Sequence, residues 1–265
     1  MIRWVCCSAG RADLFMEKTW ATLSRGGFGH RQLLLVVPQA ERDAYLWKVP
    51  MTVKVVGCPV RSLVAQRKMA RHITEEYKMI FIDDDIEAIR ILDASGQFHH
   101  ASCNEVETAF EMGLEHTNLC GVYPVANRGW MKRTVSINNA YIVGALYAIR
   151  NTPDLAEPNN DEMEDWARQL AEQAAGRPVC RLNYLAVQTK YWKNPGGLQT
   201  ERTVAKRIAA VDAVAASFQE LVRKVTRKNG LPDLRFLNRS TQLAQDHPSQ
   251  RLVNSTSGVA LAHMS

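Results

Sequence analysis

Short apolar runs alternate with longer amphipathic stretches along most of the chain, and this alternation predicts strands separated by helices. The runs that we interpret as strands cover residues 2–7, 32–37, 52–56, 79–82, 119–125, 135–149 and 179–187. The stretches with helical spacing cover residues 12–24, 61–78, 105–116 and 161–175. Strands that alternate with helices are typical of a sheet with parallel members and crossover helices. The pattern therefore predicts an α/β fold, a mixed sheet flanked by helices.

The pattern changes near residue 200. Residues 201–228 repeat apolar side chains at helical spacing, which predicts one long helix, and the opposite face of that helix is basic. Residues 229–265 are polar and weakly patterned, so we expect a flexible tail there. We therefore divide the chain into a domain over residues 1–200, a basic C-terminal helical extension and a tail.

Three carboxylates, Asp83, Asp84 and Asp85, directly follow the apolar run at residues 79–82. Like charges at the end of a strand repel one another, so such a cluster is tolerated in water or around a cation. Carboxylate oxygens at alternate positions suit Mg²⁺ or Mn²⁺ that also carries substrate phosphates. The alternative is an acidic turn that caps a helix beginning near Glu87, although a cap needs one Asp. We favour a metal-diphosphate site with Asp83 and Asp85 as ligands.

Two arginines are candidates for holding a nucleotide. The first strand stops at Ser8-Ala9-Gly10-Arg11, and a glycine turn there leaves backbone N–H groups free where nucleotides bind in open α/β sheets. Arg11 either contacts a phosphate or base or is a solvated turn residue. Arg67 belongs to a strongly basic predicted helix that precedes the acidic cluster, and it lies either beside the metal or on a solvated helix face.

Four acids open the predicted helix at residues 161–175, among them Glu164 and Asp165. The helix dipole explains part of this enrichment. Because four acids exceed what capping requires, one of them is a candidate to accept a proton from an acceptor hydroxyl.

Two loops combine cations with groups that can approach a ligand. The connector at residues 126–133 carries three cations and Trp130, which either hold phosphate and stack a ring or form an ordinary basic hairpin loop. After residue 190, Lys193 precedes Asn194-Pro195-Gly196-Gly197. The two glycines either let the backbone approach a ligand closely, with Lys193 at a phosphate, or form an ordinary turn. The adjacent His99 and His100 cannot easily share one ion, so we treat them as loop residues.

Composition adds two constraints. The 265 residues carry 33 Lys plus Arg against 27 Asp plus Glu, a net charge of +6, which favours a polyanionic partner such as nucleic acid. The six cysteines form no Cys-x-x-Cys pair, so we expect reduced, mostly buried thiols, with Cys6 and Cys7 facing opposite ways. No apolar run approaches the roughly 20 residues needed to span a bilayer, and we see no signal peptide, so we expect a cytoplasmic protein without membrane contact.

Taken together, the order of elements resembles a GT-A-type (Rossmann-like), metal-dependent nucleotide-sugar glycosyltransferase. The matching motifs are Phe81-Ile82-Asp83-Asp84-Asp85 with the Asp-x-Asp signature, the preceding Arg67, and Glu164-Asp165-Trp166 with the acidic motif. Ser8-Ala9-Gly10-Arg11, Val37-Pro38-Gln39-Ala40-Glu41 and the loop at 194–199 are most similar to the TET/JBP-associated glycosyltransferases, phage and kinetoplastid enzymes that glycosylate 5-hydroxymethylated pyrimidines in DNA.

The resemblance implies roles for individual residues. Asp83 and Asp85 would contact Mn²⁺ or Mg²⁺ and the diphosphate, with Asp84 near the ribose or the metal. Asp165, or Glu164 beside it, would be the general base. The remaining residues that would hold the UDP-sugar are Ser8, Gly10, Arg11, Arg67 and Lys193. The acceptor would be the hydroxymethyl group of a base such as 5-hydroxymethylcytosine in DNA, in the host cytoplasm if a bacteriophage encodes the protein.

One departure from the family pattern concerns the metal. Many relatives supply a metal-binding His near the end of the catalytic domain, whereas this chain has none between His116 and His247. Three explanations are open. Asn194 or Lys193 takes the place of the missing histidine at the phosphate, a histidine from the tail folds back to the site, or the metal binds more weakly than in the family pattern.

Three other functions stay open from the sequence. They are a glycosyltransferase that acts on a polysaccharide, lipid or protein, a metal-dependent nuclease or nucleotidyltransferase, and a non-catalytic DNA-binding module. None of these explains the order of strands and loops before Asp83.

Overall fold

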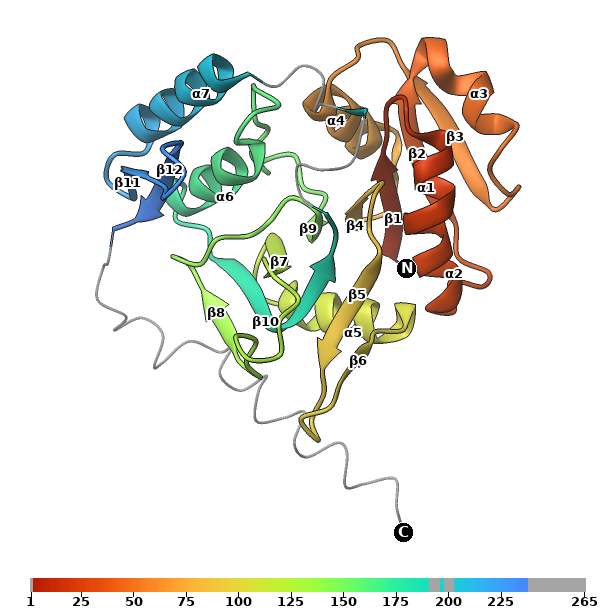
Figure 1. Cartoon of the computed structure of the whole chain (residues 1–265), viewed down its shortest axis with the longest axis horizontal. Coiled ribbons are helices and arrows are strands. Elements are labelled where there is room, and N and C mark those ends of the chain that lie inside the picture. Colours follow the sequence, from red (N-terminus) through yellow and green to blue (C-terminus); the bar gives the residue numbers. More distant parts are fainter. Residues whose placement is uncertain (1, 191–195, 198–202, 238–265) are drawn as a thin grey trace.

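The computed structural model describes residues 2–190, 196–197 and 203–237, and its core is a ten-stranded mixed sheet (Figure 1). The strand order is β3-β2-β1-β4-β9-β7-β10-β5-β6, and β8 also pairs with β10. The strands are β1 (Ile2–Cys7), β2 (Leu33–Pro38), β3 (Val53–Cys58), β4 (Lys78–Asp83), β5 (Ala88–Leu92), β6 (Phe98–His100), β7 (Leu119–Tyr123), β8 (Val135–Ile137), β9 (Leu146–Arg150) and β10 (Val179–Gln188). The first four strands along the order are parallel, and β9 enters antiparallel between β4 and β7.

Helices cover both faces of the sheet. Between β1 and β2 the helical residues are continuous from α1 (Ala12–Phe15) through a π-helical stretch η1 (Met16–Trp20) to α2 (Ala21–Arg25). The 3₁₀ turn η2 (Gln39–Glu41) and α3 (Arg42–Leu46) follow β2, and the longer helices are α4 (Leu63–Ile73), α5 (Cys103–Gly113), α6 (Glu164–Ala174) and α7 (Val204–Ser217). None of the helices in the described ranges has the length and hydrophobicity that a bilayer span requires.

The central strand β1 is buried on both faces. Trp4 and Cys6 belong to the apolar cluster under α1, α2 and α5, whereas Val5 and Cys7 belong to the cluster under α4. Successive side chains of a strand point to opposite faces, so this division confirms the opposite orientation predicted for Cys6 and Cys7. All six cysteines are buried free thiols, as expected from the sequence.

The order of strands and crossover helices predicted for residues 1–190 is confirmed, but some local predictions are wrong. The single strand predicted over 135–149 is two strands, β8 and β9, which irregular residues separate. The predicted helix over 61–78 ends at Ile73, because Thr74 takes an extended conformation and β4 already begins at Lys78. The alternative in which the acidic cluster caps a helix beginning near Glu87 is wrong, since β5 follows and alternates β-branched residues against β10. The histidines at 99 and 100 lie in β6 and not in a loop.

The predicted long helix over 201–228 is also wrong in its second half. The helix α7 ends at Ser217, and two antiparallel strands follow, β11 (Val222–Thr226) and β12 (Pro232–Phe236). Residues 222–226 include three β-branched side chains, Val222, Val225 and Thr226, and Asn229-Gly230 is a strong hairpin signal that a helical interpretation overlooks. The described part of the predicted tail therefore contains a strand, and the α7–β11–β12 unit packs on α6 through Trp166, Leu170 and Val211 (Figure 1).

Candidate active site

A cleft of about 220 Å³ lies where β1 and β4 end, at the carboxyl edge of the parallel strands. Segments that are distant in sequence line it, namely the loop after β1, the start of α4, the acidic cluster at the end of β4, residues 141–145 before β9, the start of α6, and Thr189 with Gly197 after β10. Its charged lining within the described ranges consists of six acids and three arginines, which are Asp83, Asp84, Asp85, Asp161, Glu164 and Asp165 with Arg11, Arg61 and Arg67. The cleft therefore has an excess of negative charge.

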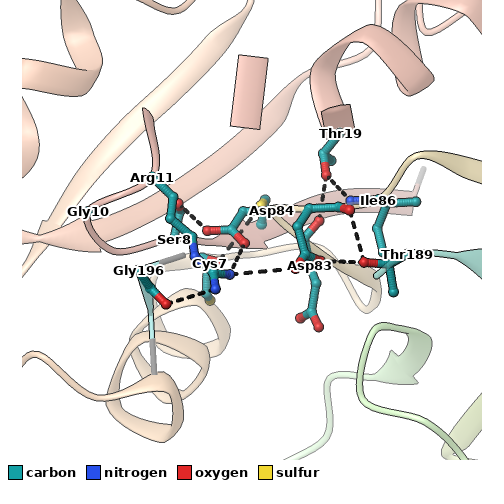
Figure 2. A network of polar contacts seen from close by, with 12 residues as sticks. Cys7, Ser8, Gly10, Arg11, Thr19, Asp83, Asp84, Ile86, Thr189 and Gly196 are labelled. Carbon is teal, nitrogen blue, oxygen red and sulfur yellow. Dashed lines mark hydrogen bonds and ion pairs between the residues drawn. The ribbon is translucent and has the colours of Figure 1, made fainter. Parts of the chain in front are cut away.

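A chain of hydrogen bonds fixes Asp84 at the base of the cleft (Figure 2). The Ser8 hydroxyl donates to Asp84 Oδ2 at 2.5 Å and shares a 2.7 Å hydrogen bond with the Tyr45 hydroxyl. Arg11 Nη1 donates to the other carboxylate oxygen at 3.0 Å. Burial raises the pKa of Asp84 to about 6, and Arg11 and the Ser8 hydroxyl oppose that rise. Ser8 and Asp84 are both buried, so their side chains position the loop and Arg11.

Arg11 joins the first loop of the chain to the glycine loop that follows β10. Its Nη2 donates to the carbonyl oxygen of Gly196 at 2.8 Å (Figure 2). The Gly197 N–H donates to the Ala9 carbonyl oxygen at 3.2 Å. Gly197 has φ +59°, and an added Cβ would lie 2.8 Å from Arg11 Cζ. The positive φ and the close approach both require glycine at this position.

Gly10 and Glu41 link the same loop to the segment after β2. The Gly10 N–H donates to Glu41 Oε2 at 2.5 Å, and Arg61 forms an ion pair with the other oxygen of Glu41. The backbone at Gly10 has φ +66°, a conformation that glycine adopts without strain. Two of the loops that carry the family resemblance therefore contact one another in the fold.

Arg67 lies at the centre of a buried ion network. Its guanidinium pairs with Glu164 and with Asp83, at 3.2 Å to Asp83 Oδ1, and donates to the Gly144 carbonyl oxygen at 2.9 Å. Arg168 pairs with the second oxygen of Glu164 at 2.6 Å, one helical turn further along α6. The Tyr147 ring lies against both guanidinium groups, with its centroid 5.2 Å from Arg67 Cζ and 4.8 Å from Arg168 Cζ. These contacts fix the start of α6 beside the acidic cluster.

Glu164 and Asp165 have different surroundings although they are adjacent. Glu164 is buried between two arginines, and their charges hold its pKa below its usual value against the effect of burial. Asp165 is half-buried, accepts a hydrogen bond from the Tyr141 hydroxyl, and has a raised pKa because of burial and the charge of Glu164. A base must be able to take up a proton, so Asp165 suits that role and Glu164 suits a structural one.

The residue before this pair has an unusual backbone. Met163, the N-cap of α6, has φ 60° and ψ 23°, the left-handed conformation that non-glycine residues rarely adopt. Such strain persists only where surrounding contacts impose it, and here Met163 is buried against Trp166 and Leu170. The turn directs Glu164 to the ion network and leaves Asp165 on the cleft wall.

The acidic cluster offers two carboxylates to a cation. Asp83, whose side chain is 37% exposed, lines the cleft together with Asp85. Burial and the neighbouring Asp85 and Asp84 raise the pKa of Asp83 to about 7, with Arg67 opposing the rise. The negative excess and the hard oxygens fit a divalent cation. Within the described ranges, no group of three His, Cys, Asp or Glu side chains forms a metal cluster, so a third protein ligand is not identified.

Most of the predicted site residues line this cleft. The connector at 126–133 does not line it, although Trp130 is exposed as expected. Lys193 and Asn194 lie outside the described residues. Sequence reasoning missed Tyr141, Thr189 and Arg168. Arg168 lies four residues after Glu164, and this spacing is a signal in the sequence that the two side chains pair on one helix face. Thr189 donates to Asp85 at 3.1 Å, and no sequence pattern indicates that contact.

Comparisons with known proteins agree with this geometry. Residues 3–197 match the family described as TET-Associated Glycosyltransferase. Among solved structures, S. aureus TarS 1–349 in complex with UDP-GlcNAc has a TM-score of 0.52 at 13% identity over 81% of this chain and 65% of TarS. A mycobacterial protein has a TM-score of 0.55 at 12% identity over 91% of this chain and 84% of its own. A comparison with curated proteins found no match.

The fold and the cleft define a GT-A glycosyltransferase fold, which confirms the fold class predicted from the sequence. This chain spans about 65% of the length of the TarS fragment, and similarity at this identity concerns the fold alone. The family match covers most of the chain. The protein therefore belongs to the TET-associated glycosyltransferase family.

Proposed function

We propose that the protein transfers a sugar from a UDP-sugar to the hydroxymethyl group of a 5-hydroxymethylpyrimidine in DNA, with Mn²⁺ or Mg²⁺ as cofactor. The observation that carries this proposal is Asp165, a half-buried carboxylate with a raised pKa on the wall of the cleft, opposite the loops after β1 and β4. Family membership and the net charge of +6 support the DNA acceptor.

In this mechanism the donor diphosphate lies at the carboxyl ends of β1 and β4. Arg11 binds the diphosphate, while Ser8 and Asp84 hold the Arg11 side chain in place. Asp83 and Asp85 would hold the cation, which supplies positive charge to the leaving nucleoside diphosphate when bound. Arg67 orients Asp83 and the start of α6.

Asp165 performs the proton transfer. The acceptor hydroxyl oxygen forms a bond to the anomeric carbon, the bond from that carbon to the diphosphate oxygen breaks, and the hydroxyl proton moves to Asp165. The Tyr141 hydroxyl, which donates to Asp165, fixes the orientation of the carboxylate. General-base catalysis of this kind contributes about 10² to 10⁴ in rate.

Intact-mass analysis tests the proposal. Oligonucleotides that contain 5-hydroxymethylcytosine, 5-hydroxymethyluracil or unmodified pyrimidine are incubated with the protein, Mn²⁺ and a panel of UDP-sugars, beginning with UDP-GlcNAc because the TarS complex contains it. We expect the mass of one sugar on a hydroxymethylated oligonucleotide, and no product with Asp83→Ala/Asp85→Ala. The variant Asp13→Asn/Asp43→Asn, which alters two exposed acids of the α1 and α3 region, is the matched control.

Two outcomes overturn parts of the proposal. Hydrolysis of a UDP-sugar without transfer to any oligonucleotide would retain the transferase site and exclude the DNA acceptor. Cleavage of the oligonucleotide or incorporation of a nucleotide would instead support the nuclease or nucleotidyltransferase alternative.

A further inference from the structure

A second hollow lies beside the cleft, on the side of α6 and the hairpin formed by β11 and β12. Aromatic side chains form part of its wall: Tyr141 stacks on Trp166 with ring centroids 4.9 Å apart, and Trp166 contacts Phe236 at the same distance. Tyr141 and Phe236 are half-buried, so parts of their rings face solvent. Tyr141 lines both the hollow and the cleft and donates to Asp165, which places the hollow next to the proposed base.

The outer face of the hairpin carries three arginines and one acid, Asp233. Arg223 and Arg235 are directly opposite in the antiparallel register, and Arg227 continues the row on the same face. All three are exposed, and the hollow is lined by Arg227 and Arg235. Arg227 pairs with Asp233, whereas neither Arg223 nor Arg235 has an ion pair with an acid in the described ranges.

Like charges directly opposite in a sheet destabilise the pair, and a two-stranded hairpin has little other support. The arrangement costs stability unless an anion lies between the two guanidinium groups. The planar guanidinium group of arginine binds phosphate through a pair of N–H donors. The phosphates of a nucleic acid backbone are therefore suitable anions for this row of arginines. Aromatic faces beside a cationic groove are also the usual platform for unstacked bases.

We propose that the hairpin and the hollow form the acceptor-strand subsite, in which Tyr141 and Phe236 stack the base beside the hydroxymethylated one and Arg223 and Arg235 bind its flanking phosphates. This inference rests on the proposed function, because it assigns the DNA acceptor of that reaction to a surface. The α7–β11–β12 unit that carries these arginines packs on α6, the helix that begins with Glu164 and Asp165 (Figure 1).

Binding of a labelled single-stranded oligonucleotide at several salt concentrations tests the arginine row. The variant Arg223→Ser/Arg235→Ser removes two phosphate contacts, so we expect the slope of log K against log salt to fall by about 1.4 in magnitude. The control Arg42→Ser/Lys54→Ser removes the same charge from the opposite edge of the sheet, near β3, and should leave the slope unchanged. Thermal unfolding checks the fold, and the first variant should unfold at the wild-type temperature or above it, since a repulsion is removed.

Kinetics test the aromatic platform. With Phe236→Leu, which keeps an apolar side chain, we expect KM for a hydroxymethylated oligonucleotide to rise about tenfold, because base stacking is lost. KM for the free hydroxymethylated nucleoside, which has no neighbouring base, should not rise.

The outcomes separate the two proposals. If the two double variants change the salt slope equally, or if the wild-type chain does not bind the oligonucleotide, the subsite is refuted. An equal rise of both KM values refutes the stacking role. If the slope falls as expected but no sugar reaches hydroxymethylated DNA, the subsite stands and the proposed reaction fails.

Discussion

Substitutions of Glu164 and Asp165 test the roles assigned to these two adjacent acids. Loss of the Glu164 charge should mainly lower stability, whereas loss of the Asp165 charge should mainly lower activity. The perturbation is Glu164→Gln, which keeps the shape and removes the charge. The Glu164 side chain is only 7% exposed and pairs with two buried arginines. After the change Arg67 still has Asp83 at 3.2 Å, whereas Arg168 loses the one acid that it pairs with among the described residues.

The magnitude follows from the cost of leaving a buried charge without its partner, about 3–5 kcal/mol. For a chain of this size, 1 kcal/mol corresponds to roughly 2–4 °C in Tm, so Glu164→Gln should lower Tm by about 6–20 °C. The pKa of Glu164 is lowered in the folded protein, so its stabilisation is present above the ordinary glutamate pKa and disappears as the pH falls through the lowered value. The difference in Tm between the two proteins should therefore shrink in acid.

The companion variant is Asp165→Asn. The pKa of Asp165 is raised, so the folded protein binds its proton more tightly than the unfolded chain, and the ionised carboxylate lowers stability at neutral pH. We expect an unchanged or higher Tm with a kcat lower by about 10² to 10⁴. Thermal unfolding and sugar-transfer rates measure both quantities. A Tm loss in Asp165→Asn equal to that of Glu164→Gln, or a wild-type Tm in Glu164→Gln, would refute the assignment of roles.

Three further predictions concern the reaction. The acid limb of kcat/KM should lie above the ordinary aspartate pKa of about 3.9, because Asp165 must be ionised and its pKa is raised; this limb should vanish in the residual activity of Asp165→Asn. Gly144→Ala should lower kcat at least tenfold, since the new Cβ would lie 2.6 Å from Glu164 Oε1, and a wild-type rate would contradict the packing described. Chelation by EDTA should abolish transfer and added Mn²⁺ should restore it; undiminished transfer in EDTA would exclude the cation.

The sequence was sufficient to predict the main part of the fold and the position of the cleft. Short apolar runs identify β1 and β4 as buried strands, and parallel strands end at the same edge, so the loop with Arg11 and the acidic cluster are expected at one cleft without any knowledge of distant contacts. The sequence analysis does not identify β5, because this short strand is defined by its pairing with β10, which lies far along the chain.

The separate roles of Glu164 and Asp165 also escape sequence reasoning. Both are acids at the start of a helix, and only the left-handed turn at Met163 and the position of Arg168 give them different surroundings. The role of Tyr141 is equally hidden in the sequence, because no residue near it along the chain indicates its hydrogen bond to Asp165. Contacts of this kind depend on side-chain placement, which hydrophobic patterns do not specify.

The hydrogen bond from Arg11 to Gly196 has a consequence for biosynthesis, since it joins residues 185 positions apart. A ribosome produces the loop after β1 almost at once and the glycine loop only after the whole sheet. A nascent chain that stops before Gly196 therefore has the contact from Arg11 to Asp84 but lacks the second one, which joins Arg11 to the glycine loop. Donor binding should begin late in translation, when the strand β10 and its following loop have emerged from the exit tunnel.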